Sequence, residues 1–124
     1  MMRTFLFVMF AVVAMSTTAF AQPVGTFSIE GRNPGAAAGP PAYTGTITIT
    51  AAGDAFDVVW VVGASRARVT GRGLFQNGVF AVTYANQQPP GPALVVYVRR
   101  GRTWVGRWLM PGTPGAGTET LTPR

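Results

Sequence analysis

Residues 43–62 constrain the fold of this chain more than any other stretch, because polarity alternates along them with a period of two. From position 44 to 50 every second residue is a threonine, and the residues between and before them are Tyr43, Gly45, Ile47 and Ile49. Such alternation with β-branched residues predicts a strand with one buried and one solvent-facing side. Residues 52–55 (Ala-Gly-Asp-Ala) predict a tight turn into a return strand over 56–62. A single hairpin cannot bury its apolar face alone, so the remaining chain must close over it.

Further strands with the same alternation are predicted on both sides of this hairpin. They span residues 25–31, 66–75, 79–84, 93–100, 103–110 and 118–122. Asn77-Gly78 is a strong signal for a type I′ hairpin turn. Residues 32–42 are rich in glycine and proline, so we interpret them as a plain connection whose only polar side chains are Arg32 and Asn33. The pattern favours an all-β fold, an antiparallel up-and-down barrel of about eight strands, over a sandwich.

A short pattern recurs in three of these strands and supports closure of the barrel. Tyr43, Val69 and Trp104 are each followed two residues later by a glycine. A glycine at such a position lets a strand bend sharply, as closure requires, while a neighbouring ring covers the gap. A barrel of about eight strands is either filled by its own side chains or holds one small ligand.

The first 21 residues have the pattern of an export signal. Arg3 gives a basic start, an apolar segment of about ten residues follows, and Ala19 and Ala21 supply the small residues of a cleavage site. A membrane-spanning helix needs roughly 20 apolar residues, so this run is too short for an anchor. We therefore predict a signal-peptide helix over residues 1–21, one barrel domain over residues 22–124, and export to a periplasm or to the extracellular space.

Charge limits the classes of partner. The ten basic residues are all arginine and the formal net charge is +6, of which Arg3 would leave with the signal peptide. Arg66, Arg68 and Arg72 share one face of their predicted strand, so one hypothesis is contact with an anionic surface, and the alternative is an ordinary solvated basic face. An exported protein seldom meets nucleic acid, so no nucleic-acid partner is expected.

The side chains that most enzymes use are missing from the chain. It has no histidine, cysteine or lysine, and its only acids are Glu30, Asp54, Asp57 and Glu119. This composition removes the usual general bases, the thiol nucleophile and most transition-metal ligands. We therefore predict a protein without catalytic activity, bound metal or cofactor.

Glu119 is the polar residue of most interest, because it shares a strand face with Leu121. If Leu121 is buried, the carboxyl group is buried too and needs a partner, for which Arg107 or the indole N–H of Trp104 or Trp108 is available. Two interpretations stay open: a rim group that ties the last strand to its neighbour, and a ligand contact. Aromatic residues near it either fill the core or line a cavity, and core filling is the simpler expectation. The interior candidates are Trp60, Tyr84, Tyr97, Trp104, Trp108 and Glu119.

Several short motifs in the chain resemble those of one protein family. They are Gly25-Thr-Phe, Tyr43-Thr-Gly-Thr, Val58-Val-Trp60, Val95-Val-Tyr97, Trp104-Val-Gly-Arg-Trp108 and Gly117-Thr-Glu-Thr-Leu121. Together they resemble small exported bacterial β-barrel proteins of unknown function, some of which are labelled fibronectin-binding. The resemblance implies a fold but no activity for any residue. The architecture is also similar to that of avidin and lipocalin barrels, although we find no avidin-like set of biotin ligands in register.

Two functions are consistent with these predictions. The first is a non-catalytic exported barrel that acts as a binding or cell-surface interaction module, for instance toward an extracellular protein. The alternative is a carrier of a small apolar ligand, of lipocalin or avidin type, that uses the aromatic interior. Segments 58–62 and 94–98 are apolar on both faces, which predicts a homodimer through their outer faces.

Overall fold

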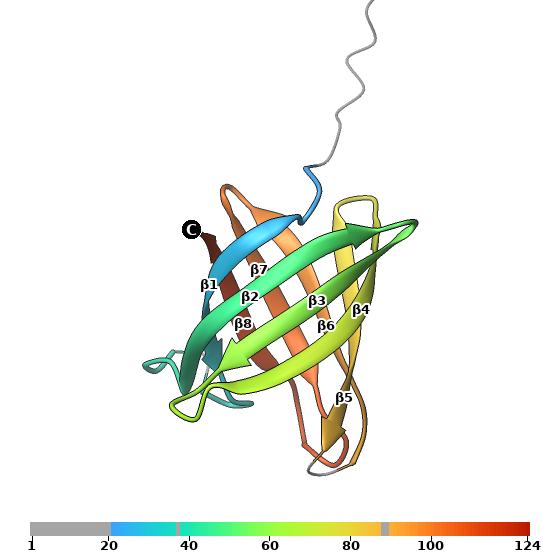
Figure 1. The fold of residues 1–124 in the computed structure, drawn as a ribbon. Coiled ribbons are helices and arrows are strands. Elements are labelled where there is room, and N and C mark those ends of the chain that lie inside the picture. The colour runs from blue at the N-terminus through green and yellow to red at the C-terminus, as the bar shows by residue number, and fades with distance from the viewer. Residues whose placement is uncertain (1–20, 37, 88–89) are drawn as a thin grey trace, which may run out of the picture.

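The alternating segments form antiparallel strands that close into one barrel in the computed structural model, which describes residues 21–36, 38–87 and 90–124 (Figure 1). The strands are β1 (Gly25–Arg32), β2 (Tyr43–Ala52), β3 (Ala55–Val62), β4 (Ala67–Gln76), β5 (Val79–Gln87), β6 (Pro90–Arg100), β7 (Thr103–Leu109) and β8 (Gly117–Pro123). No helix occurs within the described residues. The predicted all-β up-and-down barrel is therefore confirmed. The predicted signal-peptide helix lies outside the described residues, apart from its last residue.

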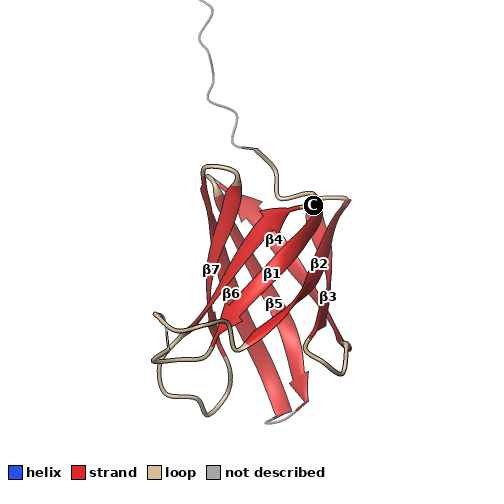
Figure 2. Ribbon diagram, turned by 90° about the vertical axis from the view of Figure 1, so that its left-hand side faces the viewer, coloured by secondary structure: helices blue, strands red, loops and turns tan. Residues whose placement is uncertain are grey.

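Closure follows from the order in which the strands pair. Each strand pairs with its neighbour in sequence, and β8 pairs back with β1. Ile29 of β1 stands opposite Gly45 of β2 on one side and Leu121 of β8 on the other. Figure 2 shows the slanted strands surrounding a common axis. A closed sheet has no unpaired edge, so its interior is the one place where the apolar faces can be buried.

The two ends of the barrel differ in their connections (Figure 1). At one end, which we call the turn end, tight turns join β2 to β3, β4 to β5 and β6 to β7, and the chain enters β1 and leaves β8 there. Asn77 and Gly78 have φ angles of 51° and 79°, as the predicted type I′ turn requires. At the opposite end, the loop end, longer connections over residues 33–42 and 110–116 join β1 to β2 and β7 to β8.

Apolar side chains fill the interior at the turn end. The rings of Phe56 and Phe80 meet edge to face with centroids 5.5 Å apart, and Phe75 meets Trp104 in the same way at 6.1 Å. Pro23, just before β1, is fully buried there. These contacts form the main core of the domain, and they contain no buried charged group.

Glycines on neighbouring strands make room for the largest interior rings. Gly106 stands opposite Tyr97, and a Cβ atom at position 106 would lie 2.6 Å from the Tyr97 ring. The rings of Tyr43, Trp60, Phe80 and Trp108 pack in the same way against Gly31, Gly71, Gly73 and Gly117. In each pair the ring comes from the adjacent strand. Gly45, the first of the three glycines in the sequence repeat, instead faces the backbone carbonyl of Val61.

Candidate functional site

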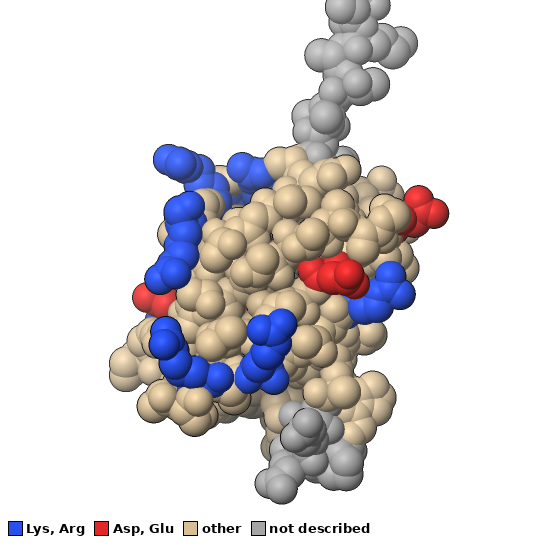
Figure 3. Space-filling view, in the orientation of Figure 1, with Lys and Arg blue, Asp and Glu red and all other residues tan. Residues whose placement is uncertain are grey.

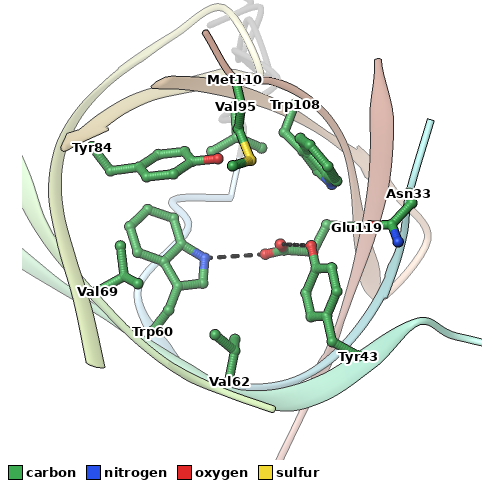
Figure 4. Close-up of a pocket in the computed structure, with 10 residues that line it drawn as sticks. All are labelled: Asn33, Tyr43, Trp60, Val62, Val69, Tyr84, Val95, Trp108, Met110 and Glu119. Atoms are coloured by element: carbon green, nitrogen blue, oxygen red, sulfur yellow. Dashed lines mark hydrogen bonds between the residues drawn. The ribbon is translucent and has the colours of Figure 1, made fainter. Parts of the chain in front are cut away.

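The barrel interior is hollow at the loop end. A cavity of about 230 Å³ remains there, with walls of aromatic rings, aliphatic side chains and one carboxyl group (Figure 4). Its lining residues are Asn33, Tyr43, Trp60, Val62, Val69, Tyr84, Val95, Trp108, Met110 and Glu119. Asn33 is exposed, while Tyr43, Tyr84 and Met110 are half-buried. The cavity therefore opens to solvent between the loops.

Glu119 is the buried acidic residue of this cavity, with 6% of its surface exposed. The Tyr97 hydroxyl donates a hydrogen bond to Oε1 at 2.6 Å, and the Trp60 indole N–H donates to the same oxygen at 3.1 Å. The Tyr43 hydroxyl donates to Oε2 at 2.7 Å (Figure 4). Because these donors come from β2, β3 and β6, the carboxyl group of β8 links strands that do not pair with its own.

Two glycines explain how the phenols reach this carboxyl group. Glu119 stands opposite Gly31 on β1 and opposite Gly106 on β7. The ring of Tyr43 packs against Gly31, and the ring of Tyr97 packs against Gly106. Each glycine thus leaves space beside Glu119 for one of its donors. A side chain at either position would take the space that the ring occupies.

The predicted burial of Glu119 beside Leu121 is confirmed, but the partners expected from the sequence are wrong. Arg107 lies on the outer face of β7 and is exposed. The Trp108 indole N–H donates to the carbonyl oxygen of Thr118 at 3.2 Å instead. Trp104 packs at the turn end. These residues lie on the strand next to β8, whereas the actual donors reach across the interior from more distant strands.

Burial changes the protonation of the ionisable groups in the cavity. It raises the pKa of Glu119 above 4.5, and the hydrogen bonds from Tyr97, Tyr43 and Trp60 offset part of this rise because they favour the charged form. Burial and the nearby Glu119 charge raise the pKa of Tyr84 to about 12. The same two causes raise the pKa values of Tyr43 and Tyr97 well above 10. The phenols therefore stay neutral near pH 7, and the charge of the cavity depends on Glu119.

The six predicted interior residues divide between the two ends of the barrel. Trp60, Tyr84, Trp108 and Glu119 line the cavity. Tyr97 is fully buried, and its ring stacks on Phe80 at 6.1 Å while its hydroxyl reaches Glu119. Trp104 belongs to the turn end, where Arg99 lies 5.9 Å from its ring centroid. Core and cavity are thus both present, at opposite ends.

Several residues of this cavity were not predicted from the sequence. Tyr43 carries a usable signal, since it is the first inward residue of the alternating β2 pattern and lies at a strand end. Met110 likewise continues the inward face of β7. Asn33 carries no such signal, because it lies in the connection that we interpreted as plain. Its presence in the cavity lining corrects that interpretation.

The predicted arginine row lies on the outer wall of the barrel. Arg68 and Arg72 are exposed on β4, and Arg66 lies in the turn before that strand with a φ angle of 53°. The Nε atom of Arg72 lies 3.3 Å from Oδ1 of Asp57, which is also exposed. Figure 3 shows arginine side chains spread over several parts of one face. None of these three arginines contributes to the cavity.

Neither a cluster of metal-ligating side chains nor a helix able to cross a membrane occurs in the part of the chain that the structure describes. No three acidic, histidine or cysteine side chains there come together as a metal site would require. Nor do the described residues contain a helix of the length and apolarity needed to cross a membrane. Glu30, Asp54 and Asp57, the remaining acids, are all exposed. Glu119 therefore stands in the cavity without an acidic neighbour.

Comparison with known proteins supports the fold. No family model matches the chain, and no curated protein matches its sequence. Among solved structures, the barrel is similar to a crystal structure of a mutant of the fluorescent protein UnaG. The TM-score is 0.54 at 15% sequence identity, over 82% of this chain and 95% of that one. At this identity the likeness shows the fold alone, a closed β-barrel.

Proposed function

We propose that this protein binds a small, mainly apolar ligand in the cavity at the loop end and carries out no reaction on it. The observation that carries the proposal is the open cavity of about 230 Å³ around the buried carboxyl group of Glu119. Ligand sites are typically concave and mainly apolar, with a few placed polar groups. The mouths of β-barrels are among the places where such sites occur. The likeness to a lipocalin-type barrel supports a binding role.

The volume of the cavity indicates the size of the ligand. An engineered cavity of about 150 Å³ holds one benzene molecule. A cavity of about 230 Å³ therefore suits one substituted ring or a short branched chain. Larger ligands would extend past Asn33 and Met110 into solvent, because these two residues lie in the loops at the mouth.

The cavity favours the carrier hypothesis over a pure surface-interaction module. An interaction module needs only its outer wall, so nothing requires its interior to stay hollow. Filling a void usually stabilises a protein by restoring lost dispersion contacts. A hollow loop end beside a well-packed turn end is therefore the feature that a surface function leaves unexplained.

Export and the absence of catalysis are parts of the same proposal. The pattern of residues 1–21 supports a role outside the cytoplasm, where such a barrel would meet its ligand in a periplasm or in the medium. The lack of histidine, cysteine and lysine supports binding without chemistry. No cofactor is needed for this function.

Native mass spectrometry of the protein purified from its own cells tests the proposal. We expect one small molecule per chain to be retained. Val69→Phe should abolish retention, because Val69 lines the cavity and the added ring would occupy it. Val59→Phe is the matched control, since Val59 is half-buried on the outer wall of β3 between Thr48 and Thr70. An empty wild-type chain that also fails to bind small apolar probes in solution would refute the proposal.

The outer wall supports a second candidate, an interface between two copies of the chain. Leu74, Ala81 and Val96 form one outward cross-strand row on β4, β5 and β6. Val79, Val98 and Val105 form another row beside it. The large side chains most exposed on this wall are Leu74 (64%), Leu109 (48%), Leu94 (39%), Val79 (38%) and Val98 (37%). Light scattering should give the mass of a dimer, and Leu74→Ser with Leu94→Ser should give a monomer; a monomeric wild type excludes this candidate.

Of the two segments predicted from the sequence to form the interface, 94–98 lies on this wall in β6, whereas 58–62 lies on β3. Outward residues of β3, such as Val59 and Val61, are half-buried and stand between polar neighbours on β2 and β4. The exposed apolar surface lies on β4 to β7 instead. We therefore place the proposed interface there.

A further inference from the structure

The charge of the cavity lining limits the chemistry of the ligand. The lining contains one carboxyl group and no basic side chain. The described arginines are exposed except Arg32, whose Nε atom donates to the carbonyl oxygen of Gly39 in the loop. Gly31 and Gly106, the residues opposite Glu119 on the adjacent strands, have no side chain that could carry a charge. An ionised Glu119 would therefore lack a positive partner.

The hydrogen bonds of Glu119 leave one acceptor position open. A carboxylate accepts about four hydrogen bonds, two on each oxygen. Oε1 already accepts two, from Tyr97 and Trp60, whereas Oε2 accepts one, from Tyr43. All three donors are neutral, so they satisfy hydrogen-bond acceptor positions of the carboxylate without compensating its negative charge. A ligand that brings one N–H donor and a positive charge supplies what is missing at Oε2.

Aromatic rings around the carboxyl group favour the same sign of charge. The ring centroids of Trp60 and Tyr84 lie 5.2 Å apart. The rings of Trp108 and Tyr43 also lie around the carboxyl group of Glu119 (Figure 4). Ring faces carry partial negative charge and attract cations within about 6 Å. An anionic ligand would meet repulsion from both the rings and the carboxylate. A neutral ligand would leave the carboxylate unpaired.

We propose that the ligand is a protonated amine with a small apolar body, whose ammonium group pairs with Oε2 of Glu119 and whose body packs against the rings of Trp60, Tyr84 and Trp108. This inference rests on the proposed ligand-binding function and names its chemical class.

The protonation of Glu119 gives the inference a pH signature. Tyr43, Tyr84 and Tyr97 are the other titratable groups that face it, and their raised pKa values keep them neutral up to about pH 10. Binding of an ammonium group requires ionised Glu119, so affinity should rise with pH as the carboxyl group loses its proton. A neutral ligand that accepts a hydrogen bond from the protonated carboxyl group would show the opposite trend.

Three probes of nearly equal size test the charge preference: phenethylamine, 2-phenylethanol and phenylacetate. We would measure their affinities for the whole protein by calorimetry and by tryptophan fluorescence. Phenethylamine should bind roughly tenfold more tightly than the alcohol, as expected for one charge-assisted hydrogen bond, and phenylacetate should bind most weakly. Equal or tighter binding of the alcohol or the acid would refute the inference while leaving ligand binding intact. No binding of any probe, with no molecule retained from cells, would instead refute the proposed function.

Two variants test whether Glu119 causes the preference for a cationic ligand. Glu119→Gln should weaken phenethylamine roughly tenfold and change 2-phenylethanol by less than about threefold. Glu30→Gln is the matched control, because it removes one negative charge from an exposed position of β1 and should leave both affinities unchanged. Circular dichroism establishes that each variant is folded. If Glu119→Gln does not fold, the order of the three probes and its pH dependence in the wild-type protein decide the question.

Discussion

The turn end and the loop end of the barrel have the same alternating strands but use the interior differently. At the turn end, phenylalanine rings and aliphatic side chains meet directly, as Phe56 and Phe80 do at 5.5 Å. At the loop end, the rings carry hydroxyl or indole N–H groups, and those of Tyr43, Trp60 and Tyr97 converge on Glu119. Polar groups in an interior must be paired, which holds the rings of Tyr43, Trp60 and Tyr97 around the carboxyl group. The cavity lies beside this arrangement.

Tyr97 joins the two ends. Its ring stacks on Phe80 and its hydroxyl donates to Glu119. The position of the carboxyl group is thus set by a residue that the packed core holds in place. Preorganisation of this kind lowers the cost of ordering side chains when a ligand binds. The turn end thus stabilises the fold, and the loop end keeps its geometry because Tyr97 extends the core into it.

Truncation of one ring at each end should give the largest difference in stability. Phe80→Ala removes a fully buried ring and should lower the free energy of unfolding by about 3–5 kcal/mol. Tyr84→Ala should cost roughly half of that or less, because Tyr84 is half-buried and already borders a cavity. Urea unfolding followed by circular dichroism measures both. Equal losses would mean that the loop end is as tightly packed as the turn end.

Alanine at the two glycines beside Glu119 should give an intermediate effect. Gly106→Ala places a methyl group 2.6 Å from the fully buried Tyr97 ring, and overpacking of this kind costs about 1–3 kcal/mol. Gly31→Ala crowds the Tyr43 ring in the same way, but Tyr43 is half-buried and can move into the cavity. We therefore expect Gly31→Ala to cost less stability and to weaken ligand binding more.

Gly39→Ala is the control for both variants, since the nearest atom to a Cβ there is 3.8 Å away. It should change stability by less than about 0.5 kcal/mol. Thermal unfolding and probe binding on the three variants separate the two effects. If Gly31→Ala proves the more destabilising, the loop end is the more rigid of the two.

The sequence predicts the barrel better than it predicts the cavity, for a physical reason. Alternation decides which face of a strand is buried, so the inward placement of Trp60, Tyr84 and Glu119 follows from their neighbours in sequence. The partner of Glu119 depends instead on which side chains are long enough to cross the interior. That depends on the curvature and register of the whole barrel. Strand adjacency pointed to Arg107, whose position next to the inward Gly106 in fact directs it outward.

The sequence also does not predict whether the interior of the barrel is hollow. The same composition of large and small residues can fill a barrel or leave a void, depending on where each ring meets a glycine. Gly31 and Gly106 each have a ring packed into the space that a side chain would take, and these pairs were visible only once the register was known. Asn33 reaches the cavity through the path of a loop, for which alternation gives no information.

The pH dependence of stability that Glu119 causes should be the smallest difference between the two ends. The pKa of Glu119 is raised in the folded protein above its value of 4.5 in the unfolded chain. Between these two pKa values the folded state holds more proton than the unfolded state, so stability falls as pH rises through this window. The protonated carboxyl group contributes its full stability below pH 4.5. Hydrogen bonds from Tyr97, Tyr43 and Trp60 favour the charged form and so keep the fall small.

Glu119→Gln isolates this dependence, because glutamine stays neutral at every pH. As pH rises above 4.5, the unfolding free energy of the wild-type protein should fall relative to that of Glu119→Gln. The wild-type protein compared with Glu30→Gln should show no such trend. Chemical unfolding at a series of pH values measures both differences.

Phenethylamine should reverse the trend for the wild-type protein alone, because a ligand that binds only the folded state with ionised Glu119 stabilises it as pH rises. A wild-type stability that rises with pH relative to Glu119→Gln without ligand would mean that the neutral donors stabilise the carboxylate more than burial destabilises it. The loop end would then need no cation to keep its carboxyl group charged.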